Sequence, residues 1–101
     1  MKTDNILVQE LLKLGASYRA GAVGLNTLAF RSETYIEYLQ SELPTEDFAC
    51  AMNCAYLIEE INAVVLDENR RPTQEEQDAI NKELTLLEKI IARNCEEGEN
   101  E

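Results

Sequence analysis

The chain of 101 residues lacks histidine and tryptophan, and only two prolines and four glycines interrupt it. The absence of histidine disfavours zinc sites of the usual Cys/His type and di-iron bundles built on Glu-x-x-His pairs. The scarcity of proline and glycine, beside abundant Leu, Ala, Glu and Ile, favours helix over strand. No uninterrupted run of about eighteen apolar residues occurs, so we predict no membrane span.

Targeting and catalytic signatures are also missing. The N-terminal residues show no basic start, long apolar middle and cleavage site, so we predict no signal peptide and a cytoplasmic location. The odd count of three cysteines fits reduced thiols better than a disulfide scaffold. There is no nucleophile elbow, phosphate loop or dinucleotide fingerprint, so we predict no enzymatic activity, no cofactor and no metal.

Four segments have the composition and apolar spacing of helices. They cover residues 4–18, 27–43, 45–68 and 74–94. The expected N-caps are Thr3 or Asp4, then Asn26, Thr45 and Thr73, the last forming a capping box with Glu76. The glycine-containing stretch 15–26 fits either a loop or a helix with a small-residue face, and we expect a break within it.

The links between the last three predicted helices are short, which places successive helices antiparallel and side by side. The sequence therefore predicts an all-α, antiparallel up-and-down helical bundle of three long helices plus an N-terminal helix. We expect residues 1–95 to form a single domain and residues 96–101 to be an acidic disordered tail.

The stretch CAMNC, residues 50–54, holds the two cysteines that lie closest together. Cys50 and Cys54 are four residues apart, so they share one helix face with several apolar residues. A metal site would need two further ligands, and Cys95 is the sole remaining thiol. We therefore expect both to be core residues, with a metal or redox pair as the alternative.

A second apolar sector on the same helix contains Phe48, Ala51, Met52, Ala55 and Leu66, interrupted by Glu59. A helix that is apolar nearly all round is buried on more than one side. Two interpretations follow: the helix is central in a monomer, or its second face forms a homodimer or partner interface. The candidate residues for self-association or anchoring are Phe48, Met52, Glu59 and Leu66.

Negative charge is concentrated in the middle of the chain. The formal net charge is −11, and residues 32–69 contain nine acidic residues and no basic one. Such a chain is repelled by nucleic-acid phosphates and by anionic lipid, so direct binding to either is disfavoured. The block either serves solubility alone or steers a basic partner. The candidate contact residues are Glu33, Glu37, Glu42, Glu46 and Asp47.

These features together predict a small, acidic, non-enzymatic helical protein that binds another protein with a basic surface. We expect it to act as an inhibitor or regulator through an acidic helix-hairpin surface, one form being a nucleic-acid mimic of the kind made by phages. The alternative is a structural or assembly adaptor that acts as a homodimeric helical bundle.

Overall fold

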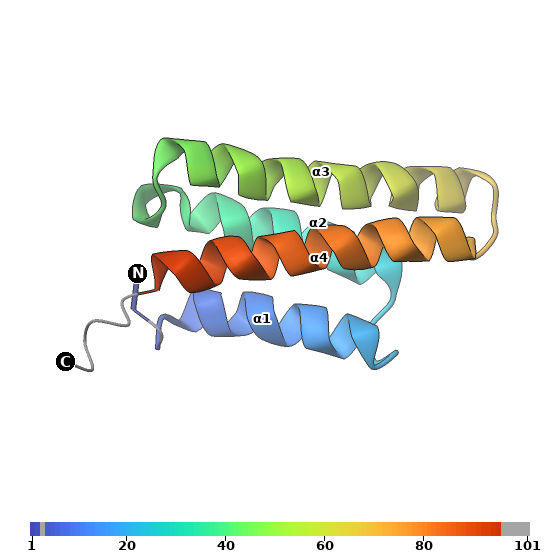
Figure 1. The fold of residues 1–101 in the computed structure, drawn as a ribbon. Coiled ribbons are helices and arrows are strands. Elements are labelled where there is room, and N and C mark those ends of the chain that lie inside the picture. The colour runs from blue at the N-terminus through green and yellow to red at the C-terminus, as the bar shows by residue number, and fades with distance from the viewer. Residues whose placement is uncertain (3, 96–101) are drawn as a thin grey trace.

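The structure is a computed structural model that describes residues 1–2 and 4–95, and all regular elements in this part of the chain are helical (Figure 1). The elements are α1 (Ile6–Arg19), α2 (Leu25–Tyr38), the 3-10 turn η1 (Gln40–Glu42), α3 (Thr45–Asp67) and α4 (Gln74–Asn94). The predicted all-α bundle is confirmed. Its proportions differ, because α1 and α2 have 14 residues each, whereas α3 has 23 and α4 has 21.

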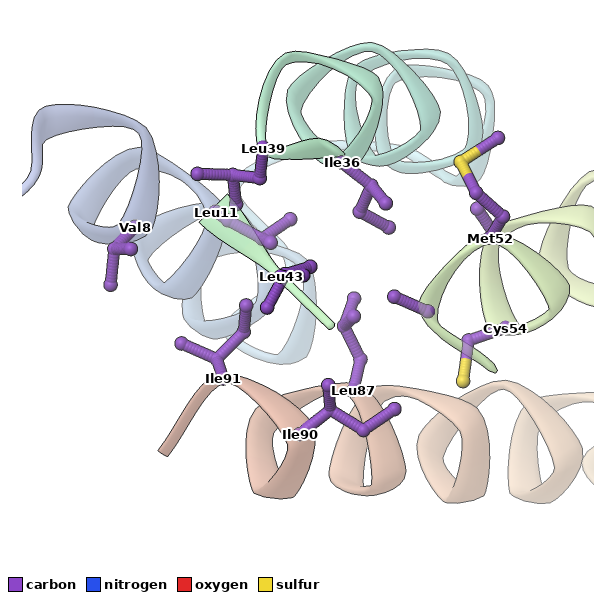
Figure 2. Close-up of a cluster of buried hydrophobic side chains, with 12 residues drawn as sticks. Val8, Leu11, Ile36, Leu39, Leu43, Met52, Cys54, Leu87, Ile90 and Ile91 are labelled. Atoms are coloured by element: carbon purple, nitrogen blue, oxygen red, sulfur yellow. The ribbon is translucent and has the colours of Figure 1, made fainter. Parts of the chain in front are cut away.

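The helices pack in chain order around a common core. α2 lies against both α1 and α3, α3 lies against α4, and a smaller contact between α1 and α4 closes the bundle. The core has two clusters of buried side chains, one at each end. The first is Val8, Leu11, Ile36, Leu39, Leu43, Ala51, Met52, Cys54, Ala55, Leu87, Ile90 and Ile91 (Figure 2), and the second is Leu14, Leu28, Ala29, Ile58, Ile80 and Leu84.

The first helix begins later than the sequence predicts. Asn5 is its N-cap, and the Asn5 side chain accepts hydrogen bonds from the backbone N–H groups of Leu7 and Val8. The predicted cap at Asp4 is therefore wrong, and the other predicted cap, Thr3, lies outside the described residues. Asparagine and aspartate serve equally well as caps, so composition alone did not distinguish the neighbours.

The predicted break between residues 15 and 26 is confirmed, and it falls after Arg19. Gly15 lies buried inside α1, whereas Gly21 has a φ of +80°, a left-handed conformation that glycine adopts without steric cost. The predicted cap Asn26 is wrong, because Gly24 occupies that position. Asn26 instead lies in the first turn of α2 and accepts a 2.9 Å hydrogen bond from Asn62 on α3.

The link between α2 and α3 also differs from the prediction. The second helix ends at Tyr38 rather than continuing to residue 43, and η1 follows. Leu43 is extended, with φ −114° and ψ 144°, because the residue before a proline avoids helical geometry. The turn keeps both Leu39 and Leu43 in the core while it reverses the chain.

Two threonines at helix starts provide a matched test of capping. Thr73 forms the predicted capping box: its hydroxyl accepts from the Glu76 N–H at 3.1 Å, and Glu76 accepts from the Thr73 N–H at 2.9 Å. The predicted cap Thr45 is wrong, because Thr45 is already helical and Pro44 precedes it without a side-chain cap.

We expect Thr73→Ala to lower the free energy of unfolding by about 1 kcal/mol, since it removes a cap that satisfies an orphan N–H group. Thr45→Ala should change it by less than about 0.5 kcal/mol, as for a surface substitution. Urea denaturation of both variants measures the difference. Equal losses would contradict the assignment of the two caps.

Candidate functional site

The two thiols of the CAMNC stretch have different surroundings. Cys54 is buried and points from α3 towards α4 (Figure 2), and burial together with Glu83 raises the pKa of its thiol to about 12. Cys50 is exposed, so the prediction of a core cysteine is right for Cys54 and wrong for Cys50. Within residues 1–2 and 4–95, no three Cys, Asp or Glu side chains are placed together as a metal site would require.

The apolar sector proposed for self-association is divided by the fold. Met52 is only 7% exposed and points from α3 towards α2 (Figure 2), and half-buried Phe48 packs against the same core cluster. Ala51 and Ala55 are fully buried beside them. The expectation that Met52 and Ala51 face a partner is therefore wrong, because α2 covers this side of α3 within the monomer.

The other two residues of that set, Glu59 and Leu66, are exposed, Leu66 by 60%. Both lie on the side of α3 that faces α2. The Asn62–Asn26 hydrogen bond fixes this register, because Glu59 and Leu66 lie one helical turn before and after Asn62.

Glu33 has two acidic neighbours, Glu59 and Glu37, where α2 and α3 run side by side. Glu33 is half-buried, and Glu59 of α3 is close enough to act on its carboxyl group. Glu37 lies one turn further along α2. Burial raises the pKa of Glu33 above its ordinary value, and the negative charges of Glu59 and Glu37 raise it further. The fold thus brings together two of the predicted contact residues with one of the predicted anchors.

Sequence reasoning did not single out Phe30, which lies next to this carboxyl cluster. Phe30 is one turn before Glu33 and one turn after Asn26 on α2, and it is 71% exposed. We define the α2–α3 face as Phe30, Glu33, Glu37, Glu59 and Leu66. It combines carboxylates with two exposed large apolar side chains, and the chain from residue 32 to 69 places no base among them.

The remaining predicted contact residues lie near the α2–α3 turn. Glu42 in η1 and Glu46 in the first turn of α3 are exposed. Asp47 is turned towards α4, where it accepts hydrogen bonds from Arg93 at 2.6 Å and Asn94 at 2.7 Å. These two donors lower the pKa of Asp47. Asp47 is thus engaged within the chain, where Arg93 of α4 matches its charge.

Outside the α2–α3 face, α3 carries a second set of exposed apolar residues. By length and composition alone α3 is apolar enough to cross a membrane, a test that a core helix of a soluble protein also passes. In its most apolar window, 39% of the residues are buried inside the bundle. The uncovered residues include Tyr56, Leu57 and Val64.

A surface hollow of about 490 Å³ lies where the C-terminal end of α1 meets α4. Its polar side chains are engaged with one another and with neighbours: the Tyr18 hydroxyl donates to Gln77 at 2.8 Å, and Arg19 forms an ion pair with Glu88. Neither a cysteine, a serine nor a carboxylate is among the residues that line it. The α2–α3 face is therefore the stronger candidate site.

Comparisons with protein families, with curated proteins and with solved structures give no significant match.

The carboxyl cluster has a consequence for stability. We expect Glu33→Gln to raise the free energy of unfolding at pH 7 by about 0.2–0.5 kcal/mol for each like-charge contact it removes. Because the folded state raises the pKa of Glu33, its ionisation destabilises the fold above that pKa, and protonation relieves the penalty as the pH falls.

The gain from Glu33→Gln should therefore shrink between neutral pH and pH 4, as measured by urea denaturation at several pH values. Glu60→Gln is the control, because exposed Glu60 lies on the outer side of α3. If Glu33→Gln raised the free energy of unfolding by the same amount at every pH, the claim that neighbouring carboxylates destabilise ionised Glu33 would be contradicted.

Proposed function

We propose that this protein binds another protein with a basic surface through its α2–α3 face, and that it acts as an inhibitor or regulator rather than as an enzyme. The observation that carries the proposal is that Glu59 and Glu37 both act on Glu33, and that all three belong to a segment, residues 32–69, that contains no basic residue. Asp47 shows the contrast, because its charge is matched by Arg93 within the chain.

The physical reason for binding is the repulsion between carboxylates in the unbound protein. Three neighbouring carboxylates repel one another, and bringing a lysine or arginine of a partner among them converts that repulsion into attraction. At longer range a block of one charge sign steers an oppositely charged partner and accelerates its encounter. The exposed Phe30 and Leu66 supply apolar area that gains free energy when water is removed from it.

A nucleic-acid mimic is one specific form of this function. A carboxylate-rich face held by two packed helices is rigid, and it would occupy the basic groove of a DNA- or RNA-binding protein in place of the phosphates. Occupying the groove would block access of the nucleic acid, which is a direct mechanism of inhibition. The net charge of −11 opposes direct binding to the nucleic acid itself.

The test is capture of partners from the lysate of the source organism on the tagged protein, washed at about 50 mM and about 500 mM salt. We expect a basic protein that is retained at low salt and released at high salt, because screening weakens exposed charge pairs. A partner retained equally at both salt concentrations would contradict an electrostatic mode of binding. DNA or RNA is then added to the captured complex. A nucleic-acid mimic requires that the added nucleic acid competes for the partner and releases it.

Self-association is the second candidate function, and the exposed Leu57 and Val64, two turns apart on the outer side of α3, favour it. Light scattering measures the mass of the wild type and of Val64→Asp. A dimeric wild type that becomes monomeric in the variant supports the adaptor role, whereas a monomeric wild type overturns it. Phe48→Asp is unsuitable for this test, because half-buried Phe48 packs against the core.

A further inference from the structure

We infer that the partner presents a basic amphipathic α-helix to the α2–α3 face, with its apolar side against Phe30 and Leu66 and its lysines or arginines beside the carboxylates. The inference rests on the proposed function and specifies the chemistry of the partner. Three features of the face carry it: the placement of the two apolar side chains, the helical surroundings and the distribution of charge.

The apolar side chains are positioned as anchors. Phe30 and Leu66 are 71% and 60% exposed, among the most exposed large hydrophobic residues of the described chain. They come from two different helices that run antiparallel, and the Asn26–Asn62 hydrogen bond links these helices. Phe30 lies one turn after Asn26 and Leu66 one turn after Asn62, so the two anchors lie on opposite sides of this link, roughly 12 Å apart along the helix axes.

The surroundings favour a helix over an extended peptide. An extended peptide gains affinity by adding to the edge of a sheet, and the described residues contain no strand to offer such an edge. The backbone groups of α2 and α3 are already bonded within their helices. A helix of about fourteen residues is roughly 21 Å long, which matches the length of α2. Such a helix would pack along the pair as a further member of the bundle.

The charges favour a basic occupant. Glu33, Glu37 and Glu59 cluster beside the anchors, and burial with mutual repulsion already raises the pKa of Glu33. The base nearest in sequence, Arg31, lies on the opposite flank of α2, where it lines a small hollow with Glu10 and Lys13 of α1. A helix with lysines on both sides of an apolar stripe is complementary to this arrangement.

The test uses a fluorescently labelled peptide of leucine and lysine, about eighteen residues long, with leucines at i, i+3, i+4 and i+7. A second peptide has the same composition in an order without helical periodicity. Fluorescence anisotropy measures the binding of both to the full chain. We expect the amphipathic peptide to bind at least about tenfold more tightly, equivalent to ~1.4 kcal/mol, and to become helical on binding by circular dichroism.

Matched variants assign the binding to the face. The double variant Phe30→Ala/Leu66→Ala should lower the affinity for the amphipathic peptide by about tenfold. Leu57→Ala with Val64→Ala, on the outer side of α3, should leave it unchanged. Thermal melts confirm that both double variants remain folded, as expected for exposed positions.

The outcomes separate this inference from the proposed function. Equal affinity for the two peptides, with binding lost in Glu33→Lys/Glu37→Lys, overturns the helical partner and leaves the proposed function intact. Binding that is indifferent to Glu33→Lys/Glu37→Lys overturns both. Absence of binding by the amphipathic peptide overturns the helical partner, and the captured partner then decides the proposed function alone.

Discussion

Replacing Ile58 with alanine is expected to lower the free energy of unfolding by about 2–5 kcal/mol. Ile58 is fully buried on α3 and packs in the second core cluster, with Leu28 and Ile80 among its members. The substitution removes apolar contacts and leaves a cavity that the surrounding helices only partly fill. Urea denaturation followed by circular dichroism measures the loss.

Leu66→Ala is the control for Ile58→Ala, because it removes a similar side chain from the same helix at a position that is 60% exposed. We expect Leu66→Ala to change the free energy of unfolding by less than about 0.5 kcal/mol. Similar losses in both variants would mean that Leu66 is covered within the monomer, which contradicts the α2–α3 face as a free surface.

The double variant Glu33→Lys/Glu37→Lys is expected to weaken binding of the captured basic partner by at least about tenfold, equivalent to ~1.4 kcal/mol. Both residues lie on the α2–α3 face, and the change turns attraction for a cationic partner into repulsion. Calorimetry or biolayer interferometry at low salt measures the affinity. The difference from the wild type should narrow at high salt.

The stability of that variant provides an internal control. Lysine at position 33 would lie beside Glu59, which now forms a like-charge contact with Glu33, so we expect the fold to be retained or slightly stabilised. Weaker binding in a fully folded variant assigns the loss to the surface. Unchanged affinity in the folded variant would show that the partner binds elsewhere.

The fold could be predicted because its signals are local and agree with one another. Apolar spacing, the capping box of Thr73 and Glu76, and Pro44 at the end of the hairpin turn each mark an element or a boundary. Short links then leave an antiparallel bundle as the simple solution. The predicted N-caps at Asn26 and Thr45 were wrong because α2 and α3 begin without a side-chain cap, at Gly24 and Pro44, and the Asn26 side chain is engaged with Asn62 instead.

The candidate site could be predicted only in part, because α3 is apolar around most of its circumference. Spacing along the sequence shows that Cys50 and Cys54 lie on a similar side of α3. It does not show which part of that side the neighbouring helices bury. Packing against α2 and α4 buries Met52 and Cys54 and leaves Cys50 and Leu66 exposed. Phe30 carried no signal of exposure, since a phenylalanine in an amphipathic helix is ordinarily placed in the core.

The most direct test of the central claim compares Glu59→Lys with Glu60→Lys in binding the captured partner. The residues are adjacent on α3 and the change in charge is identical, but Glu59 contacts Glu33 on the α2–α3 face, whereas exposed Glu60 lies on the outer side. We predict that Glu59→Lys weakens binding by at least about tenfold and that Glu60→Lys changes it less than about threefold. Equal effects would show that net charge alone, and not this face, attracts the partner.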